Sequence, residues 1–177
     1  SGSKHKRQHS AYKNSYTTTL FCYLHKGFNR IRKTKQKEKE IKMQSEINLE
    51  YKVQYADTDA YGVVWHGTYL RWMEAGRVEW LFSKGVRIDE LARDFGIVMP
   101  VVDINIKYKF PAKLLNNVIV STTVKEFSAV SITFSQIVKI KETGKICTIA
   151  EVRATAIDKN GRVIRDLAGL LGLKEDC

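Results

Sequence analysis

The chain has 177 residues, with 30 Lys+Arg against 19 Asp+Glu and a formal net charge of +11. This length is enough for one domain with a sizeable core and too short to expect two. Residues 1–42 hold 12 of the basic and 2 of the acidic side chains, which leaves 18 and 17 in residues 43–177. Nucleic acid binding is therefore not expected of residues 43–177, because they carry almost no excess positive charge.

Residues 1–42 are predicted to be a basic leader, and residues 43–177 the folded domain. The leader resembles an organelle transit segment because it contains few acidic residues. It also resembles an arm that binds a membrane surface or nucleic acid through apolar anchors, Phe21, Tyr23, Leu24 and Phe28. We favour a third interpretation, a disordered extension that opens with a tag remnant, SGSKHKRQHS. The expected location is cytoplasmic, or an organelle lumen if the leader is a transit segment.

The cysteines and the apolar runs narrow the class of protein further. Cys22, Cys147 and Cys177 are scattered and form no CxxC pair, so neither a disulfide framework nor a thiolate zinc site is predicted. No apolar run approaches the roughly 20 residues of a membrane-spanning helix. We expect a protein of a reducing compartment without a transmembrane segment.

Along the chain, the first predicted element is a strand in INLEYKVQYADTD, which alternates from Ile47 and stops at Asp59 and Gly62. The next segment, HGTYLRWMEAGRVEWLFSKG, predicts a long helix from near His66 that ends at Gly85. Apolar residues cover most of the circumference of this helix, so we expect it to be buried on more than one side. A short second helix is predicted in IDELARDFG.

The remaining sequence predicts strands joined by tight turns. Alternating apolar residues mark strands near 104–110, 118–124, 130–138 and 146–154. Thr143-Gly144 and Asn160-Gly161 are turn signals, and the second is typical of a type I′ hairpin. Strands joined by short turns are antiparallel, so the pattern predicts an α+β fold in which an antiparallel meander wraps around the long helix.

The outer face of such a sheet is left without a covering layer. Where that face carries apolar residues such as Ile137 and Ile149, oligomerisation is the expected way to cover it. We therefore expect a homo-oligomer.

Several kinds of active site are excluded by the sequence of residues 43–177. This segment holds no GxSxG elbow, no P-loop and no GxGxxG between a strand and a helix. His66 is its only histidine, which argues against a multi-histidine metal site and leaves a Ser-His-Asp triad without an elbow serine. Carboxylate chemistry remains.

The stretch YADTDAYGVVWHGTYL offers the groups that thioester hydrolysis requires. A thiol with a pKa of about 8.5 leaves readily as its thiolate, so one carboxylate and donors for the carbonyl oxygen suffice. Asp59 ends the strand, Gly62 allows a sharp turn, and a helix starting near His66 points free N–H groups at that turn. The alternative is that Asp57 and Asp59 only cap a turn. An intrahelical ion pair is expected between Glu74 and Arg77.

The segment YADTDAYGVVWHGTYLRWMEAGRVEW resembles the N-terminal signature of the 4-hydroxybenzoyl-CoA thioesterase family, hotdog-fold acyl-CoA thioesterases, and especially its Tol-Pal-associated branch. The likeness extends over residues 47–167. It implies a hotdog fold and hydrolysis of the thioester of a small or medium acyl-CoA, or of an acyl carrier protein, to acid and thiol. No cofactor is implied, since coenzyme A is part of the substrate. It also implies a dimer or tetramer with active sites between subunits.

The resemblance assigns roles to individual residues. Asp59 matches the essential carboxylate, as nucleophile or general base, and Asp57 a supporting one. The backbone N–H of His66 matches the group that polarises the thioester carbonyl, and the His66 side chain adds a possible contact. The neighbouring substrate-binding positions are Gly62, Val63, Val64 and Trp65, and the supporting helix positions are Glu74 and Arg77.

One departure from the family concerns how coenzyme A is held. In the aroyl-CoA enzyme the strand region matching Ser128, Ala129 and Val130 is basic, but here that charge is missing. The candidates for contact with coenzyme A are Arg165, Lys109, Lys113 and Ser131. Two other functions stay open: a hotdog dehydratase or hydratase that uses His66 with a carboxylate, and a non-catalytic module that binds acyl thioesters or proteins.

Overall fold

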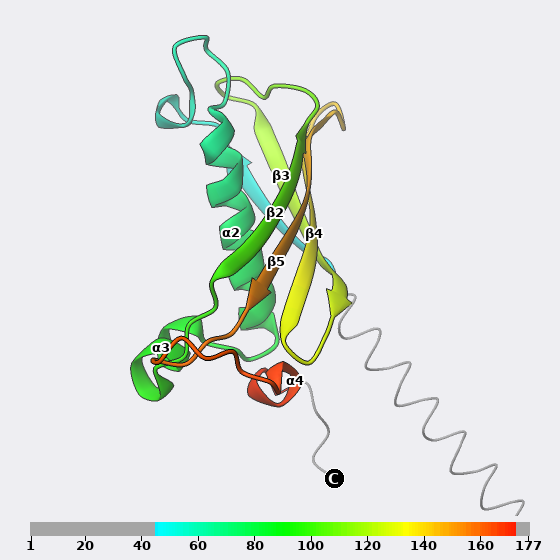
Figure 1. The fold of residues 1–177 in the computed structure, drawn as a ribbon. Helices are drawn as coiled ribbons and strands as arrows, with labels where there is room; N and C mark the ends of the chain where they lie inside the picture. Colours follow the sequence, from blue (N-terminus) through cyan, green and yellow to red (C-terminus); the bar gives the residue numbers. More distant parts are fainter. Residues whose placement is uncertain (1–44, 173–177) are drawn as a thin grey trace, which may run out of the picture. The chain divides into compact units, whose positions relative to one another are not determined.

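The computed structural model describes residues 45–172, and the predicted leader lies outside the described residues. Strands and helices follow one another in the predicted order along the chain (Figure 1). The elements are β1 (Ile47–Lys52), the 3-10 helix η1 (Tyr55–Asp57), α2 (His66–Ser83), α3 (Ile88–Phe95), β2 (Val101–Tyr108), β3 (Asn117–Phe127), β4 (Ser131–Ile140), β5 (Ile146–Thr155) and α4 (Leu167–Leu170).

The five strands form one antiparallel sheet, and α2 lies across one face of it (Figure 1). The strand order is β1-β3-β4-β5-β2. Contacts of α2 with β1, β3 and β4 hold it on the sheet. The predicted α+β architecture, a curved sheet around one long helix, is confirmed.

Alternation along the central strands produces the core. In β3 and β4 every second residue is buried toward α2, while the residues between are partly exposed on the outer face. Ile137 and Ile149 pair directly across β4 and β5 on that outer face and are half-buried. The core side of the sheet is lined by Val118, Val120, Thr122, Val124, Ile132, Phe134, Gln136, Val138, Ala150 and Val152.

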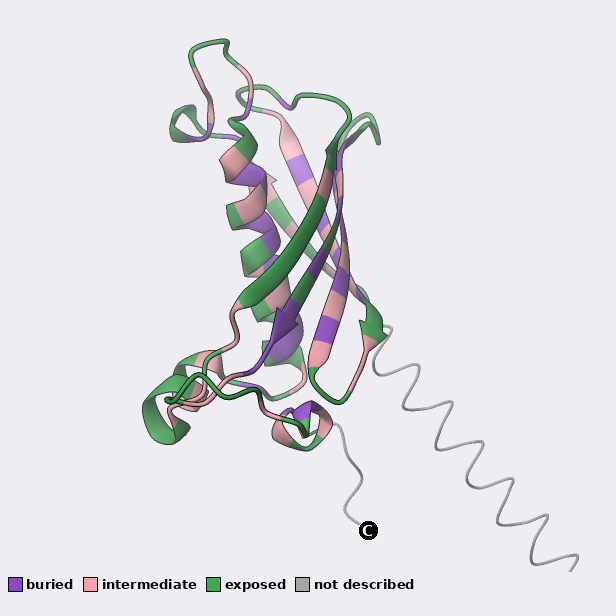
Figure 2. Cartoon of the chain, viewed as in Figure 1, coloured by how far each residue is buried: buried purple, intermediate pink, exposed green. Residues whose placement is uncertain are grey.

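One face of α2 is buried against the sheet and the opposite face is open (Figure 2). Gly76 lies at the closest approach, since a Cβ there would be 2.4 Å from the Thr122 hydroxyl oxygen. On the open face, Val78 is 44% and Phe82 53% exposed. The expectation that α2 is buried on more than one side is therefore wrong for the single chain. The buried residues are Thr68, Tyr69, Trp72, Met73, Gly76, Trp80 and Leu81.

The first strand is shorter than predicted. β1 ends at Lys52, and Tyr55 lies in η1 with 82% of its surface exposed. The carboxylate of Asp57 accepts a hydrogen bond from the backbone N–H of Gln54 at 2.9 Å. A side chain that captures a backbone donor competes with strand pairing, so the chain turns before Asp59.

The predicted meander of four strands is wrong for β2. Only β3, β4 and β5 follow one another as neighbours, whereas β2 pairs with β5 at the far edge. Residues 109–116 carry the chain across the end of the sheet from β2 to β3 (Figure 1). This connection is too long for a hairpin turn and contains Pro111, which cannot donate to a strand ladder.

The turn at Asn160-Gly161 differs from the predicted type I′ form. Such a turn requires positive φ at both central residues, and only Gly161 has it, with φ 76. The side chain of Asp158 accepts hydrogen bonds from the backbone N–H groups of Asn160 and Arg162. These bonds stabilise a wider loop between the bridged residues Ile157 and Val163.

Candidate functional site

Residues 57–65 form a small hairpin that leads directly into α2. The N–H of Asp59 donates to the carbonyl of Val63 at 2.9 Å, and the N–H of Trp65 donates to the carbonyl of Asp57 at 2.9 Å. Gly62 occupies the tip with φ 72, a left-handed conformation that glycine adopts without steric cost. The sequence predicted Gly62 as the turn residue, and the structure confirms this.

The two carboxylates of the hairpin have different surroundings. Asp57 is buried, accepts from the Gln54 N–H, and forms an ion pair with Arg71 of α2. Asp59 is half-buried, and one of its oxygens accepts from the N–H of Tyr61 at 2.9 Å. No other partner of the Asp59 carboxylate occurs among residues 45–172. Asp57 therefore anchors the hairpin to the helix, while Asp59 keeps an oxygen available for chemistry.

Arg71 is the residue that the sequence analysis missed. It lies five residues after His66 on the exposed side of α2, and its guanidinium reaches back to Asp57. A signal was present: a single charged residue in the first two turns of a helix, preceded by a carboxylate that needs a partner. The link between hairpin and helix could have been proposed from that pair.

The N-terminus of α2 offers backbone donors beside the hairpin. Trp65 is the residue before the helix, in an extended conformation, and its side chain makes no capping hydrogen bond. The first-turn N–H of Thr68 donates to the Trp65 carbonyl, but within residues 45–172 the N–H groups of His66 and Gly67 have no hydrogen-bond acceptor. These two donors, with the positive end of the helix dipole, can stabilise negative charge on an oxygen.

Aromatic rings surround these donors. The ring of Trp65 folds onto Gly67, where a Cβ would lie 2.1 Å from it, so only glycine leaves room. Trp65 also contacts the ring of His66, with centroids 4.9 Å apart. The hydroxyl of Tyr108 on β2 donates to the His66 carbonyl at 3.2 Å. The rings form an apolar wall beside the free N–H groups, and Trp65 itself is 51% exposed.

Behind this wall, two titratable groups of the core are held in their neutral forms. Burial raises the pKa of Tyr69 to about 12, and its hydroxyl accepts from the N–H of Ala112 at 3.0 Å. Burial also raises the pKa of the Cys147 thiol. Since the thiolate is the reactive form of cysteine, burial makes the Cys147 thiol less reactive.

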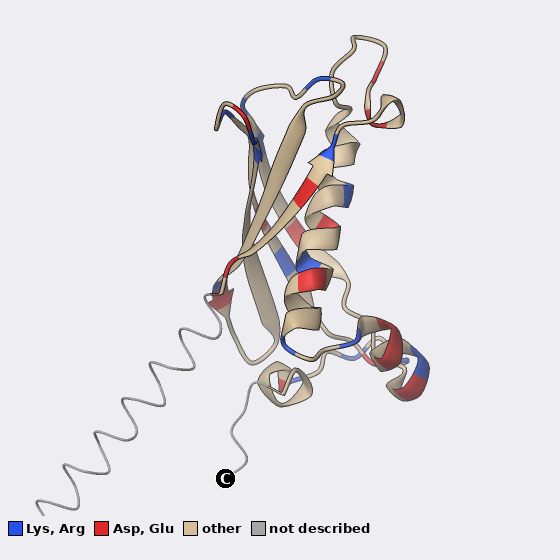
Figure 3. Ribbon diagram, turned by 180° about the vertical axis from the view of Figure 1, so that it is seen from behind, with Lys and Arg blue, Asp and Glu red and all other residues tan. Residues whose placement is uncertain are grey.

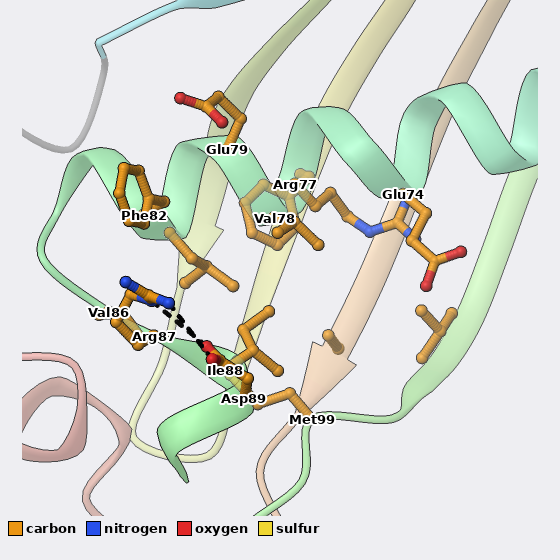
Figure 4. A pocket seen from close by; sticks show the side chains of 14 residues that line it. Glu74, Arg77, Val78, Glu79, Phe82, Val86, Arg87, Ile88, Asp89 and Met99 are labelled. Atoms are coloured by element: carbon orange, nitrogen blue, oxygen red, sulfur yellow. Dashed lines mark hydrogen bonds and ion pairs between the residues drawn. The ribbon is translucent and has the colours of Figure 1, made fainter. Parts of the chain in front are cut away.

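Glu74 and Arg77 do not form the predicted ion pair. Arg77 donates instead from Nη1 to Oε1 of Gln136 at 2.9 Å. Burial lowers the pKa of Arg77, and attraction by Glu74 partly opposes this. Both residues line a cavity of about 680 Å³ between α2, α3 and the sheet (Figure 4). The amide of Gln136 is the better-placed partner because it is fixed in the core, whereas Glu74 is exposed.

The residues predicted to contact coenzyme A fall into two groups. Lys113 is next to the hairpin, since it forms a bridge with Val63, and Lys109 follows β2 at the same end of the sheet. Ser131 begins β4 and Arg165 precedes α4, at the opposite end of the sheet (Figure 1). Within one chain, Ser131 and Arg165 therefore do not meet Asp59.

Charge is unevenly distributed over residues 45–172, and neither a cluster of metal ligands nor a membrane-spanning helix occurs there. Over residues 45–172, no group of three or more His, Cys, Asp and Glu is arranged to hold a metal ion. In the same range, no helix has the length and apolar character needed to cross a bilayer. Charged residues gather on α3 and on the open face of α2, while the central strands are mostly uncharged (Figure 3).

The comparisons with known proteins agree on one protein family. A profile of the thioesterase-like superfamily matches residues 53–169. The Synechocystis protein sll0410, provisionally named an esterase, is 33% identical over 75% of this chain and 80% of its own length. Acyl-CoA thioesterase YbgC of Haemophilus influenzae is 31% identical over 60% of this chain and 77% of its own.

Among solved structures, the 4-hydroxybenzoyl-CoA thioesterase of a Pseudomonas species superposes with a TM-score of 0.66. The two share 22% identity, and the alignment covers 73% of this chain and 99% of the other. At that identity the match concerns the fold, and it confirms the hotdog architecture predicted from the resemblance. The chain belongs to the thioesterase-like superfamily.

Proposed function

We propose that this chain hydrolyses a small or medium acyl-CoA through Asp59, with the carbonyl oxygen held by the N–H groups of His66 and Gly67. Acyl-CoA thioester hydrolysis is the activity that the family, its named members and the fold support together. The observation that carries the assignment of Asp59 is its environment: within residues 45–172, Asp57 has an ion pair and Asp59 has none. The junction between the hairpin and α2 therefore supplies both the carboxylate of Asp59 and the backbone N–H donors of His66 and Gly67.

The chemistry follows one of two routes. In one, Asp59 attacks the thioester carbon, the thiolate leaves, and water then hydrolyses the mixed anhydride to the acid and free Asp59. In the other, Asp59 takes a proton from water as the water attacks, and the collapsing intermediate releases the thiolate. In both routes negative charge develops on the carbonyl oxygen. Removing one such N–H donor typically costs about 10²–10³ in rate.

The decisive test of this function is thiol release by Asp59→Asn. Wild type is expected to hydrolyse some members of a panel of short, medium and aromatic acyl-CoAs, and Asp59→Asn is expected to lose at least about 10² in kcat. Asp158→Asn is the matched control, because Asp158 also caps a surface turn through its carboxylate but lies away from α2. Equal kcat values for wild type and folded Asp59→Asn refute the assignment.

The carrier of the acyl group can be tested in the same assay. Lys113 and Lys109, both exposed, are the predicted contacts of coenzyme A that lie at the hairpin end, and Lys145 and Arg71 are further cations there. These exposed cations are available to the phosphates of coenzyme A, and an acyl carrier protein is the alternative carrier. A lower KM for the acyl carrier protein thioester than for the matching acyl-CoA favours the protein carrier.

We also propose that the working unit is a homo-oligomer. β2 is an edge strand, and its exposed residues include Val101, Val102 and Ile104. An exposed, apolar edge tends to pair with another strand. Antiparallel pairing of β2 with a second copy would bring the α4 end of one chain to the hairpin end of the other. Arg165 and Ser131 would then approach coenzyme A from the second copy.

A further inference from the structure

A partly buried cation lies at one end of the cavity beside α2. Among the described residues, Arg77 donates one hydrogen bond, to the neutral amide of Gln136. No carboxylate among residues 45–172 is within ion-pair distance of it, and Glu74 acts on it only from farther away. A guanidinium carries five N–H donors, and desolvating it without an anionic partner is unfavourable. Arg77 therefore has unused capacity to bind an anion.

The position of Arg77 is fixed by buried groups. Gln136 is fully buried, and its Nε2 donates to the Met73 carbonyl at 2.7 Å and to the Thr122 hydroxyl at 2.8 Å. These two bonds orient the amide so that its oxygen faces Arg77. The guanidinium is thus held by the core of the protein at the edge of the cavity.

The cavity beyond Arg77 is mainly apolar. Its volume of about 680 Å³ is in the range of small-molecule sites, roughly 300–1,000 Å³. Val78 and Phe82 continue its wall along α2, as Figure 4 shows, and Arg87 and Asp89 at its far end satisfy each other through two hydrogen bonds. Apolar walls are completed by Leu81, Val86, Ile88, Met99, Phe134 and Ala154.

We propose that this cavity binds a medium-chain fatty acid, with its carboxylate on Arg77 and its chain directed along α2 toward Phe82. An arginine fork suits a carboxylate, and the walls suit an unbranched chain. The choice of an acid rests on the proposed function, because thioester hydrolysis releases acids of this class. Glu74 and Glu79 also line the cavity and repel the anion. Glu74, which attracts Arg77 electrostatically, is the more sensitive probe of the ligand's charge.

Calorimetric titration with octanoate and octan-1-ol tests the proposal, because the two ligands share a chain and differ in charge. Wild type is expected to bind octanoate about 10- to 100-fold more tightly than octan-1-ol, the range expected for hydrogen bonds to a charged group. Arg77→Gln is expected to remove this preference. Arg93→Gln is the matched control, since Arg93 pairs with Asp94 on α3 and does not line the cavity, and it is expected to keep the preference.

Two further variants locate the ligand. Glu74→Gln is expected to tighten octanoate binding, since it removes a charge of the same sign as the ligand's. If the cavity instead held a hydroxyl group through Glu74, the same variant would bind octan-1-ol more weakly. Val78→Trp fills the cavity from an exposed position and is expected to abolish binding of both ligands. Equal affinities of wild type for octanoate and octan-1-ol, or unchanged octanoate binding by folded Arg77→Gln, overturn the proposal.

Asp59→Asn separates this proposal from the thioesterase assignment. The variant is expected to keep octanoate binding while it loses hydrolysis. Loss of octanoate binding in Asp59→Asn would place the acid at the hairpin and refute the cavity site. Hydrolysis by wild type without preferential octanoate binding would refute the cavity site alone.

Discussion

At the scale of single residues, the two hairpin carboxylates differ in burial and in their bonds. Asp57 is buried and bonded on both oxygens, to Gln54 and to Arg71. Asp59 makes one turn-capping bond. Asp57 is therefore expected to stabilise the fold, whereas Asp59, which has a carboxylate oxygen without a partner among residues 45–172, is the one proposed to react.

Asp57→Asn is therefore expected to lower stability more than Asp59→Asn. The amide loses the charge opposite Arg71 and can leave a buried group unsatisfied, at a cost of about 1–3 kcal/mol. The loss of one turn bond in Asp59→Asn costs about 1 kcal/mol or less. Urea unfolding at pH 7 measures both free energies of unfolding. Equal losses in the two variants would contradict the division of roles.

Tyr69 is expected to make stability fall at high pH. Its folded-state pKa of about 12 exceeds the ordinary value of 10.0 because burial disfavours the anion. Above pH 10 the unfolded chain loses this proton more readily than the folded chain, so the stability present below pH 10 declines as the pH rises toward 12. Tyr69→Phe should show a shallower decline.

The control for Tyr69→Phe is its stability at pH 7, where the lost bond to Ala112 gives a constant offset. Urea unfolding at pH 7, 9 and 11 separates that offset from the slope. Parallel stability curves for wild type and Tyr69→Phe across this range would refute the role of Tyr69.

At the scale of elements, the start of α2 depends on the fit between Trp65 and Gly67. In Gly67→Ala the new Cβ displaces the flexible ring, and the better helix propensity of alanine limits the change in stability to about 1 kcal/mol. The Trp65 ring should then move away from the N–H groups of His66 and Gly67. Because this ring lies beside the donors of the proposed site, kcat/KM for thioester hydrolysis should fall.

Fluorescence checks this displacement directly. The emission of Trp65, obtained by subtracting a Trp65→Phe background, should shift to longer wavelength in Gly67→Ala because the ring becomes more exposed. An unchanged Trp65 spectrum would show that the ring does not rest on Gly67.

The sequence predicts these elements well where one face is buried. In β3, β4 and β5, buried and exposed residues alternate because the inner face of the sheet packs against α2. The start of the helix at His66 is predicted because the polar turn ends there. Local patterns do not specify which strand pairs with which, so the position of β2 beside β5 was missed. The end of β1 was missed because the decisive event, capture of the Gln54 N–H by Asp57, involves a side chain rather than a pattern.

The same limit applies to the site. Asp59, Gly62 and His66 were predicted because they are close in sequence and belong to one motif. The roles of Arg71 and Gln136 depend on contacts across 14 and 59 residues of chain, which no local pattern reveals. The separation of Arg165 from Lys113 similarly follows from the path of the sheet.

At the scale of the whole molecule, the exposed edge of β2 predicts assembly. Ile104→Lys places a charge on an exposed position of that edge and is expected to give monomers where wild type gives dimers or tetramers. Sedimentation velocity at matched concentrations measures the change. Val163→Lys is the control, since Val163 is also exposed and apolar but lies outside the edge strand. Monomeric wild type would contradict this interface.

The path of the chain from β2 to β3 has a consequence for folding kinetics. β3, β4 and β5 are joined by short turns and close with little loss of entropy, whereas the residues of β2 pair with residues of β5 that lie 40–53 positions away in sequence. We expect the three-strand unit to be formed in the transition state and β2 to be added afterwards. Substitutions in β2 should thus accelerate unfolding and leave the folding rate nearly unchanged, so the strand that borders the cavity is also the first to detach.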